Sequence, residues 1–367
     1  MNQNFYYTLV SGHVNGWTIS LLKVALAIAA KIYVLIINIR NFLYDKQVLK
    51  THHVKATVIS IGNITLGGTG KTPLVVWLCN YLHQQNLSCA VLTRGYKTHA
   101  KRNTKSNESP DTITDEPGIL SENCPQAEII VDPDRVAGAA KAINKFGAKV
   151  LIMDDGFQHS RLVRDLDIVT IDATLPFGYE KIFPAGLLRE PLTSLRRADV
   201  AVITRCDQIS EPELDNIENK LRAVNPNILI AQSIHAAVNI KSADNAETTV
   251  ERLKGSKIYA FCGIGNPNAF FNTIKALGAE ITGLKIYKDH YKYTQASLAD
   301  IYTQARLTGA ELILTTQKDW TKIKPLKPDK KEIRLAYLAV EIKFIDGRDR
   351  LTGLIKDTLA GKISNIN

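Results

Sequence analysis

The hydrophobic residues of this chain follow one pattern before residue 50 and another after it. Between Gly16 and Lys50, apolar residues dominate one continuous helical stretch. At about 100° per residue, five of its small or polar side chains share an arc of roughly 80°; these are Ser20, Lys23, Ala27, Lys31 and Asn38. The wide apolar remainder and the two internal lysines favour a helix in the membrane interface, with its lysines toward the headgroups, over a spanning helix. An amphipathic helix packed on the protein's own core is the alternative.

From Ala56 onward, short apolar runs alternate with helix-like segments. Strands that alternate with helices indicate a parallel sheet covered by helices. The strands predicted in the first part are Thr57–Ile61, Cys89–Thr93, Glu128–Val131, Val150–Met153, Ile168–Ile171 and Val200–Thr204. Helices are predicted at Thr72–Gln84 and Arg135–Phe146.

A second series of strands begins at Lys257. It comprises Lys257–Cys262, Glu280–Ile286 and Leu312–Thr316, with a helix that ends near Leu277. The polar interval Gln208–Glu251 predicts a surface helix and a connection between two α/β domains. We therefore expect a membrane-associated helical region at 1–50, a larger parallel-sheet domain at 51–230, and a smaller α/β domain with its linker at 231–367.

Composition limits the possible partners. The chain has 46 Lys and Arg against 36 Asp and Glu, a formal charge of +10, which indicates anionic partners. Its five cysteines are scattered without a C-x-x-C pair, which excludes a disulfide scaffold and gives no zinc-ligand spacing. We find no basic and aromatic motif for nucleic acid and expect none as a partner.

The strongest local signal is the segment Ser60–Pro73, SIGNITLGGTGKTP. It follows a predicted strand and opens a predicted helix, as a phosphate-binding loop requires. The expected nucleotide-binding residues are Gly67, Gly68, Thr69, Gly70, Lys71 and Thr72. Lys71 would reach the β- and γ-phosphates, and the hydroxyl of Thr72 would bind Mg²⁺. The larger domain is therefore expected to be P-loop NTPase-like.

A second candidate segment is Val150–His159, VLIMDDGFQH. An apolar strand that ends in Asp154 and Asp155 places two carboxylates beside the phosphate loop, where either could bind Mg²⁺. A plain Asp-Gly turn is the alternative, and it would be preferred without the upstream loop. Gln158 and His159 extend into the same region, and we count them with the nucleotide-binding residues.

A third strand ends at Thr204-Arg205-Cys206-Asp207, which superficially resembles the guanine-reading motif of P-loop GTPases. Arginine stands where that motif has lysine, and the two side chains are not interchangeable there. GTP use therefore stays the lesser alternative.

Together these segments resemble the tetraacyldisaccharide 4′-kinase family, the lipid A 4′-kinases of Gram-negative bacteria. The match covers about residues 10 to 350; its most distinctive parts are Asp154–His159 and Phe183–Glu190, FPAGLLRE. The resemblance implies an ATP- and Mg²⁺-dependent transferase of lipid A (lipopolysaccharide) biosynthesis. It would phosphorylate the 4′-hydroxyl of a tetraacylated glucosamine disaccharide 1-phosphate at the cytoplasmic face of the bacterial inner membrane, bound peripherally or monotopically to an anionic surface. We expect a monomer.

The same resemblance implies the catalytic residues. Asp115 would be the base that receives the proton of the acceptor hydroxyl, with His290 as its partner, and domain closure would bring the two together. Arg135 and Arg189 match active-site arginines, and they suit either the γ-phosphate or the substrate's 1-phosphate. The alternatives are a P-loop kinase of a soluble metabolite and a membrane-associated P-loop NTPase switch.

Overall fold

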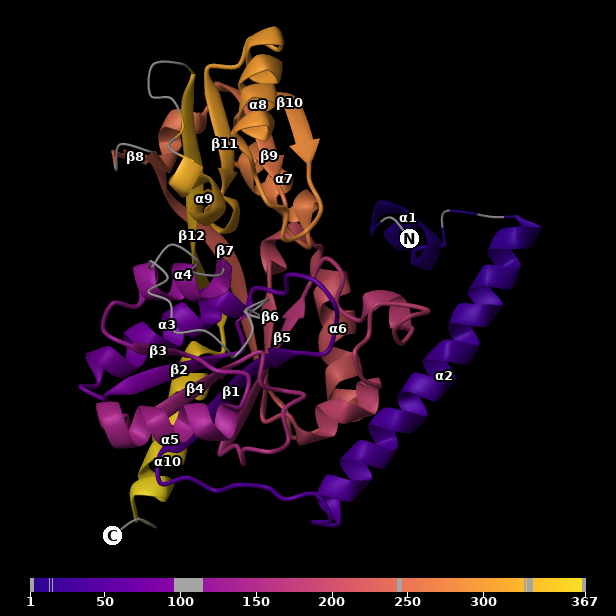
Figure 1. Ribbon diagram of the computed structural model, residues 1–367, viewed down its shortest axis with the longest axis vertical. Coiled ribbons are helices and arrows are strands. Elements are labelled where there is room, and N and C mark those ends of the chain that lie inside the picture. The colour runs from indigo at the N-terminus through magenta and orange to yellow at the C-terminus, as the bar shows by residue number, and fades with distance from the viewer. Residues whose placement is uncertain are drawn as a thin grey trace, which may run out of the picture. The chain divides into compact units, whose positions relative to one another are not determined.

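The computed structural model describes residues 3–12, 14, 16–95, 115–242, 246–326, 328 and 333–364. The chain divides into two compact units (Figure 1). Unit 1 comprises residues 1–94, 132–234 and 344–367; unit 2 comprises residues 95–131 and 235–343. Two long strands, β7 (Leu229–Ser242) and β12 (Arg334–Asp346), carry the chain from one unit into the other.

Unit 1 contains a parallel sheet in the order β7-β6-β5-β1-β4-β2. Its further strands are β1 (Thr57–Asn63), β2 (Cys89–Thr93), β4 (Val150–Asp154), β5 (Leu166–Asp172) and β6 (Val200–Thr204). All five are buried along their whole length, which explains their continuous apolar sequences. In this register the ends of β1, β4, β5 and β6 meet at one edge, where the sequence motifs lie.

After the N-terminal region, the helices of unit 1 are α3 (Lys71–Gln84), α5 (Arg135–Phe146), α6 (Glu211–Val224) and α10 (Arg348–Ser364). Helix α3 lies against β1 and β4, and α5 lies against β2 (Figure 1). Phe157, Leu195 and Leu221 belong to one buried apolar cluster of unit 1. This cluster holds the loop after β4 against the segments that follow β5 and β6.

Unit 2 is a smaller α/β unit, with the strand order β10-β9-β11-β12-β7 and β8 antiparallel to β7. Its strands are β3 (Glu128–Val131), β8 (Glu247–Thr249), β9 (Lys257–Cys262), β10 (Glu280–Ile286) and β11 (Leu312–Thr316). Its helices are α4 (Asp115–Asn123), α7 (Pro267–Ala276), α8 (Gln295–Leu307) and α9 (Gln317–Ile323). Helix α4 packs against α9.

Residues 1–50, expected as a separate region, belong to unit 1, and the division differs from the expected boundaries 51–230 and 231–367 at two further places. Residues 95–131 join unit 2, because α4 packs on α9. Residues 344–367 return to unit 1, where α10 contacts β1. Both differences arise from long-range packing, which a linear change of pattern does not reveal.

The N-terminal region forms α1 (Gln3–Val10) and one long helix, α2 (Trp17–Asp45; Figure 1). By length and composition alone, α2 could also cross a membrane, with a mean hydropathy of 2.2 over its most apolar window. Eight large apolar side chains along one face are each 51–62% exposed; these are Leu21, Val24, Ile28, Ile32, Leu35, Ile36, Ile39 and Phe42. This apolar face is therefore not covered by the described part of the chain, contrary to the alternative of a core-packed helix.

The opposite face of α2 contacts the rest of unit 1. Ala30 and Ile37 are buried, and the ring of Tyr33 lies 5.9 Å from that of Phe183. Lys23 differs from the expectation that it faces headgroups, because its ammonium donates to the carbonyl of Val14 at 2.9 Å. The segment before α2 folds back onto this lysine. Lys31 is exposed.

Candidate active site

The loop between β1 and α3 has the backbone of a phosphate-binding loop. Gly67 (φ 115°) and Gly70 (φ 86°) adopt conformations that other residues rarely take. Gly70 is also the N-cap of α3, and no side chain caps the helix there. The first N–H groups of α3 and the positive end of its dipole therefore face the loop, with Lys71 and Thr72 in the first turn.

Lys71 and Arg189 converge on Asp155. The Lys71 ammonium lies 3.3 Å from Asp155 Oδ1, and Arg189 Nη1 lies 2.9 Å from both carboxylate oxygens. Burial raises the pKa of Asp155, but the charges of Lys71 and Arg189 outweigh it and hold this pKa well below its usual range. Two cations thus share one carboxylate at the edge of the phosphate loop, which leaves one positive charge in excess there.

The segment that carries Arg189 runs beside the phosphate loop. The N–H of Leu66 donates to the carbonyl of Leu187, and the N–H of Arg189 donates to the carbonyl of Ile64, both at 2.7 Å. Among the described residues, Arg189 Nε is buried without a hydrogen-bond partner. Arg189 is therefore fixed by backbone pairing, with its guanidinium at the phosphate loop.

The two adjacent aspartates have different surroundings. Asp154 is 3% exposed and accepts from the Thr93 hydroxyl at 3.4 Å, whereas Asp155 has a left-handed backbone (φ 53°) and faces Lys71. The turn of the chain after β4 sends the two carboxylates in different directions. No cluster of three acidic, His or Cys side chains that could hold a metal is present among the described residues. A hydroxyl and two carboxylates are nevertheless hard oxygen donors of the kind that Mg²⁺ takes together with phosphates and water.

Arg135 begins α5 and is buried, with 6% exposure. Its guanidinium donates to the carbonyls of Asp132 at 2.7 Å and Asp154 at 3.3 Å. Burial lowers the pKa of this guanidinium, and the charges of Asp154 and Asp155 offset this shift only in part. Arg135 therefore lies at the end of β4, close to the two aspartates.

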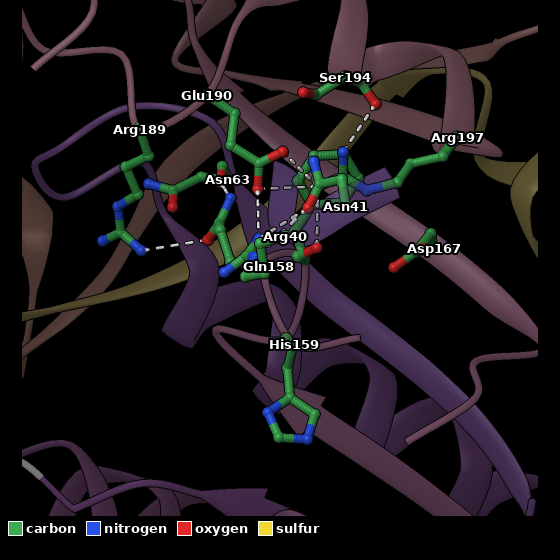
Figure 2. Close-up of polar contacts among 12 residues, drawn as sticks. Arg40, Asn41, Asn63, Gln158, His159, Asp167, Arg189, Glu190, Ser194 and Arg197 are labelled. Atoms are coloured by element: carbon green, nitrogen blue, oxygen red, sulfur yellow. Dashed lines mark hydrogen bonds and ion pairs between the residues drawn. The ribbon is translucent and has the colours of Figure 1, made fainter. Parts of the chain in front are cut away.

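Gln158 and His159 are placed differently. Gln158 donates to the carbonyl of Asn63 at 2.9 Å and accepts from Arg189 at 3.5 Å, so it joins the end of β1 to this arginine. His159 lies apart from that contact (Figure 2), and its Nε2 is buried without a hydrogen-bond partner among the described residues. Burial, assisted by Arg135, lowers the pKa of His159 to about 4. Its ring is therefore neutral at neutral pH.

Glu190 and Arg197 form a second contact that the sequence did not reveal (Figure 2). Glu190 is fully buried, and its carboxylate lies 2.8 Å and 3.0 Å from Arg197 Nη2. Arg197 also donates to the carbonyl of Phe157 at 3.0 Å and stacks on that ring, 3.8 Å from its centroid. Arg197 thus fastens the Phe183–Glu190 segment to the Asp154–His159 loop. Arg40 of α2 approaches Glu190 at 3.9 Å.

His290 lies in unit 2, in a left-handed conformation (φ 58°). Its N–H donates to Asp289 at 3.0 Å, and its Nε2 lies 3.4 Å from the ammonium of Lys318, which also binds Asp289 at 3.1 Å. Asp115 begins α4 in the same unit, and its side chain lies outside the described residues. The expected closure of two domains is therefore not what would bring Asp115 and His290 together.

Comparison with known proteins agrees with these motifs. Residues 22–360 match the family model described as tetraacyldisaccharide-1-P 4′-kinase. The chain is 36% identical over 320 residues to a tetraacyldisaccharide 4′-kinase of Halothermothrix orenii, covering 81% of this chain and 82% of that protein. It is 32% identical over 346 residues to the protein of that name from Chlorobaculum tepidum, covering 90% and 96%.

A solved structure is similar over almost the whole chain. The crystal structure of LpxK from Aquifex aeolicus in complex with ATP superimposes with a TM-score of 0.69 at 28% identity, covering 92% of this chain and 99% of that one. The sequence match and the shared fold extend across both units. The chain described here belongs to the tetraacyldisaccharide-1-P 4′-kinase family.

Proposed function

We propose that this protein transfers the γ-phosphate of ATP to the 4′-hydroxyl of a tetraacylated glucosamine disaccharide 1-phosphate. The observation that carries the proposal is the convergence of Lys71 and Arg189 on Asp155 at the edge of the phosphate loop. Phosphoryl transfer depends mainly on positioning and on stabilising the charge of the transferred group. An incoming phosphate can bind both Lys71 and Arg189, because the single carboxylate of Asp155 neutralises only one of their two positive charges.

The residues have separate roles in this proposal. Gly67–Thr72 bind the ATP phosphates through backbone N–H groups, and Lys71 and Arg189 stabilise the developing charge. Asp115 receives the proton of the 4′-hydroxyl, and His290 orients it. Mg²⁺, when bound, would be held by Thr72 with Asp154 or Asp155 and would neutralise phosphate charge. Arg135, buried beside β4, supports the two aspartates.

The exposed apolar face of α2 gives the protein a surface for the inner membrane, where an acylated substrate resides. Exposed leucines and isoleucines on one helix face insert into the boundary between headgroups and acyl chains. Replacing Ile32, Ile36 and Ile39 by serine should weaken binding to anionic vesicles at least ten-fold, since each buried side chain contributes about 1.5–3 kcal/mol. Asn38→Ser on the same helix is the matched control.

The experiment that tests the activity is transfer of labelled phosphate from ATP to the defined acceptor by the purified full-length protein. We expect transfer that requires the acceptor and is lost in Asp115→Asn. Hydrolysis of ATP or GTP at the same rate without acceptor would instead support a nucleotide switch. Transfer to a soluble sugar, unaffected by vesicles, would support a soluble metabolite as substrate.

A further inference from the structure

The strand-end motif Thr204–Asp207 contacts the phosphate loop, although the proposed chemistry does not use it. Arg205 is 7% exposed and has a left-handed backbone (φ 59°). Its Nη1 pairs with Asp172 at the end of β5, and its Nη2 donates to the carbonyl of Gly68 at 3.1 Å. Because Asp172 balances its charge, Arg205 acts on the loop through a directed hydrogen bond rather than through net charge.

Thr204 holds the next peptide of the loop. It is fully buried, and its hydroxyl donates to the carbonyl of Thr69 at 3.0 Å. The Thr69 hydroxyl lies 2.7 Å from that of Thr170, which in turn is 3.1 Å from the carbonyl of Gly62. Two consecutive carbonyls of the phosphate loop, those of Gly68 and Thr69, are therefore fixed by buried side chains at the end of β6.

The direction of these carbonyls sets the direction of the neighbouring N–H groups. In a planar trans peptide, the carbonyl of one residue and the N–H of the next point in opposite directions. Holding the Gly68 carbonyl toward Arg205 turns the N–H of Thr69 the other way, and holding the Thr69 carbonyl toward Thr204 does the same for Gly70. These N–H groups lie in the part of a phosphate loop that binds the nucleotide phosphates.

We propose that Thr204 and Arg205 are positioning residues for the nucleotide phosphates, which orient the Thr69 and Gly70 amides before ATP binds. Gly67, Gly68 and Gly70 give this backbone unusual freedom, so without the two anchors the peptides can rotate. A rotated peptide would present a carbonyl oxygen to a phosphate oxygen, which is repulsive. The proposal rests on the proposed function only in that the loop binds a nucleotide.

The test compares dissociation constants for ATP, ADP and AMP in the purified full-length protein, measured by titration calorimetry. Thr204→Val removes one hydroxyl with almost no change of shape, and we expect it to weaken ATP and ADP about five-fold each, the value of one hydrogen bond of about 1 kcal/mol. Arg205→Met should weaken both by about ten-fold or more, because the lost donor is charged. AMP affinity and the KM for the acceptor should stay near the wild-type values.

Two controls separate positioning from general support of the fold. Thr204→Ser keeps the hydroxyl and should restore nucleotide affinity. Leu221→Ala opens a cavity in the same apolar core, away from the loop, and should lower the melting temperature while leaving ATP affinity unchanged. Unchanged ATP and ADP affinity in both Thr204→Val and Arg205→Met would overturn the proposal, as would a wild-type protein that binds neither nucleotide. A protein that binds ATP but transfers nothing to the disaccharide would refute the proposed function and leave this inference standing.

Discussion

Arg189 and Glu190 are neighbours in the chain, yet they belong to two contacts of opposite character. Arg189 shares the partly exposed Asp155 with Lys71, so this contact has more cations than carboxylates. Glu190 is fully buried and binds Arg197, which is itself stacked on Phe157. The first contact can release its charges to a ligand. The second cannot open without leaving a buried carboxylate unpaired, so it serves the structure.

The largest effect should follow from Lys71→Ala. Loss of a preorganised cation at a transferring phosphoryl group costs about 3–4 kcal/mol, or roughly 10²–10³ in kcat. The folding stability should hardly change, because the partly exposed Asp155 keeps Arg189. The measurement is steady-state transfer to the acceptor, beside urea unfolding. Lys362→Ala, which breaks another lysine–aspartate contact of unit 1 at 2.8 Å, is the control and should retain activity.

Arg197→Met should have the reverse profile. It leaves the Glu190 carboxylate buried and uncompensated, which we expect to lower the free energy of unfolding by about 2–3 kcal/mol. The loss is smaller than for a fully buried pair because Arg197 itself is partly exposed. Urea denaturation monitored by tryptophan fluorescence measures this loss. A fall of less than about 0.5 kcal/mol, the scale of an exposed ion pair, would contradict a structural role for the pair of Glu190 and Arg197.

A smaller effect is the dependence of folding stability on pH that His159 should cause. Its pKa is lowered to about 4 in the fold, so the unfolded chain binds a proton more readily below its ordinary pKa of 6.5. The contribution of His159 to stability is therefore complete above pH 6.5 and is lost as the pH falls toward 4. The free energy of unfolding of the wild type should therefore fall relative to that of His159→Gln as the pH is lowered from 6.5 to 4. If the difference in free energy of unfolding between the two proteins stayed constant from pH 7 to pH 4, the neutral buried ring would be contradicted. Burial raises the pKa of Asp167 to about 6, which gives stability the opposite dependence on pH. That dependence is common to both proteins and cancels in the difference.

The smallest effect is expected for Arg40→Met. Arg40 lies 3.9 Å from Glu190 and is 38% exposed, so solvent screens the pair and its contribution should stay below about 1 kcal/mol. Comparison with Arg197→Met by urea unfolding then shows which arginine balances the buried carboxylate. Equal losses in the two variants would assign that role to both.

Most of the sheet of unit 1 was predictable, because buried parallel strands have continuous apolar sequences. Cys89–Thr93 and Val200–Thr204 were predicted with the bounds that the structure has. Strands β7 and β12 were missed, since their alternating and polar stretches resemble connections, and the boundaries near residues 94 and 344 depend on contacts distant in sequence. The sequence also could not indicate that Lys23 would be engaged by Val14.

The site divides in the same way. Lys71, Asp155 and the glycines were identified from local order, because a phosphate loop is a short continuous motif. Arg189 came from family resemblance, and its convergence on Asp155 required the fold. The contact of Arg205 with Gly68 joins residues 137 positions apart, so no local pattern contains it. Glu190 and Arg197 are only 7 residues apart, but their pairing depends on how the chain folds between them. Roles for Asp115 and His290 stay predictions.

The central claim is that the Asp155 contact serves chemistry and the Glu190 contact serves the fold. Its most direct test measures kcat/KM for ATP and the free energy of unfolding in parallel for Arg189→Met and Arg197→Met. We expect Arg189→Met to lose roughly 10² in kcat/KM with its free energy of unfolding almost unchanged, whereas Arg197→Met should be the less stable protein. Equal losses of activity and of stability in the two variants would contradict it.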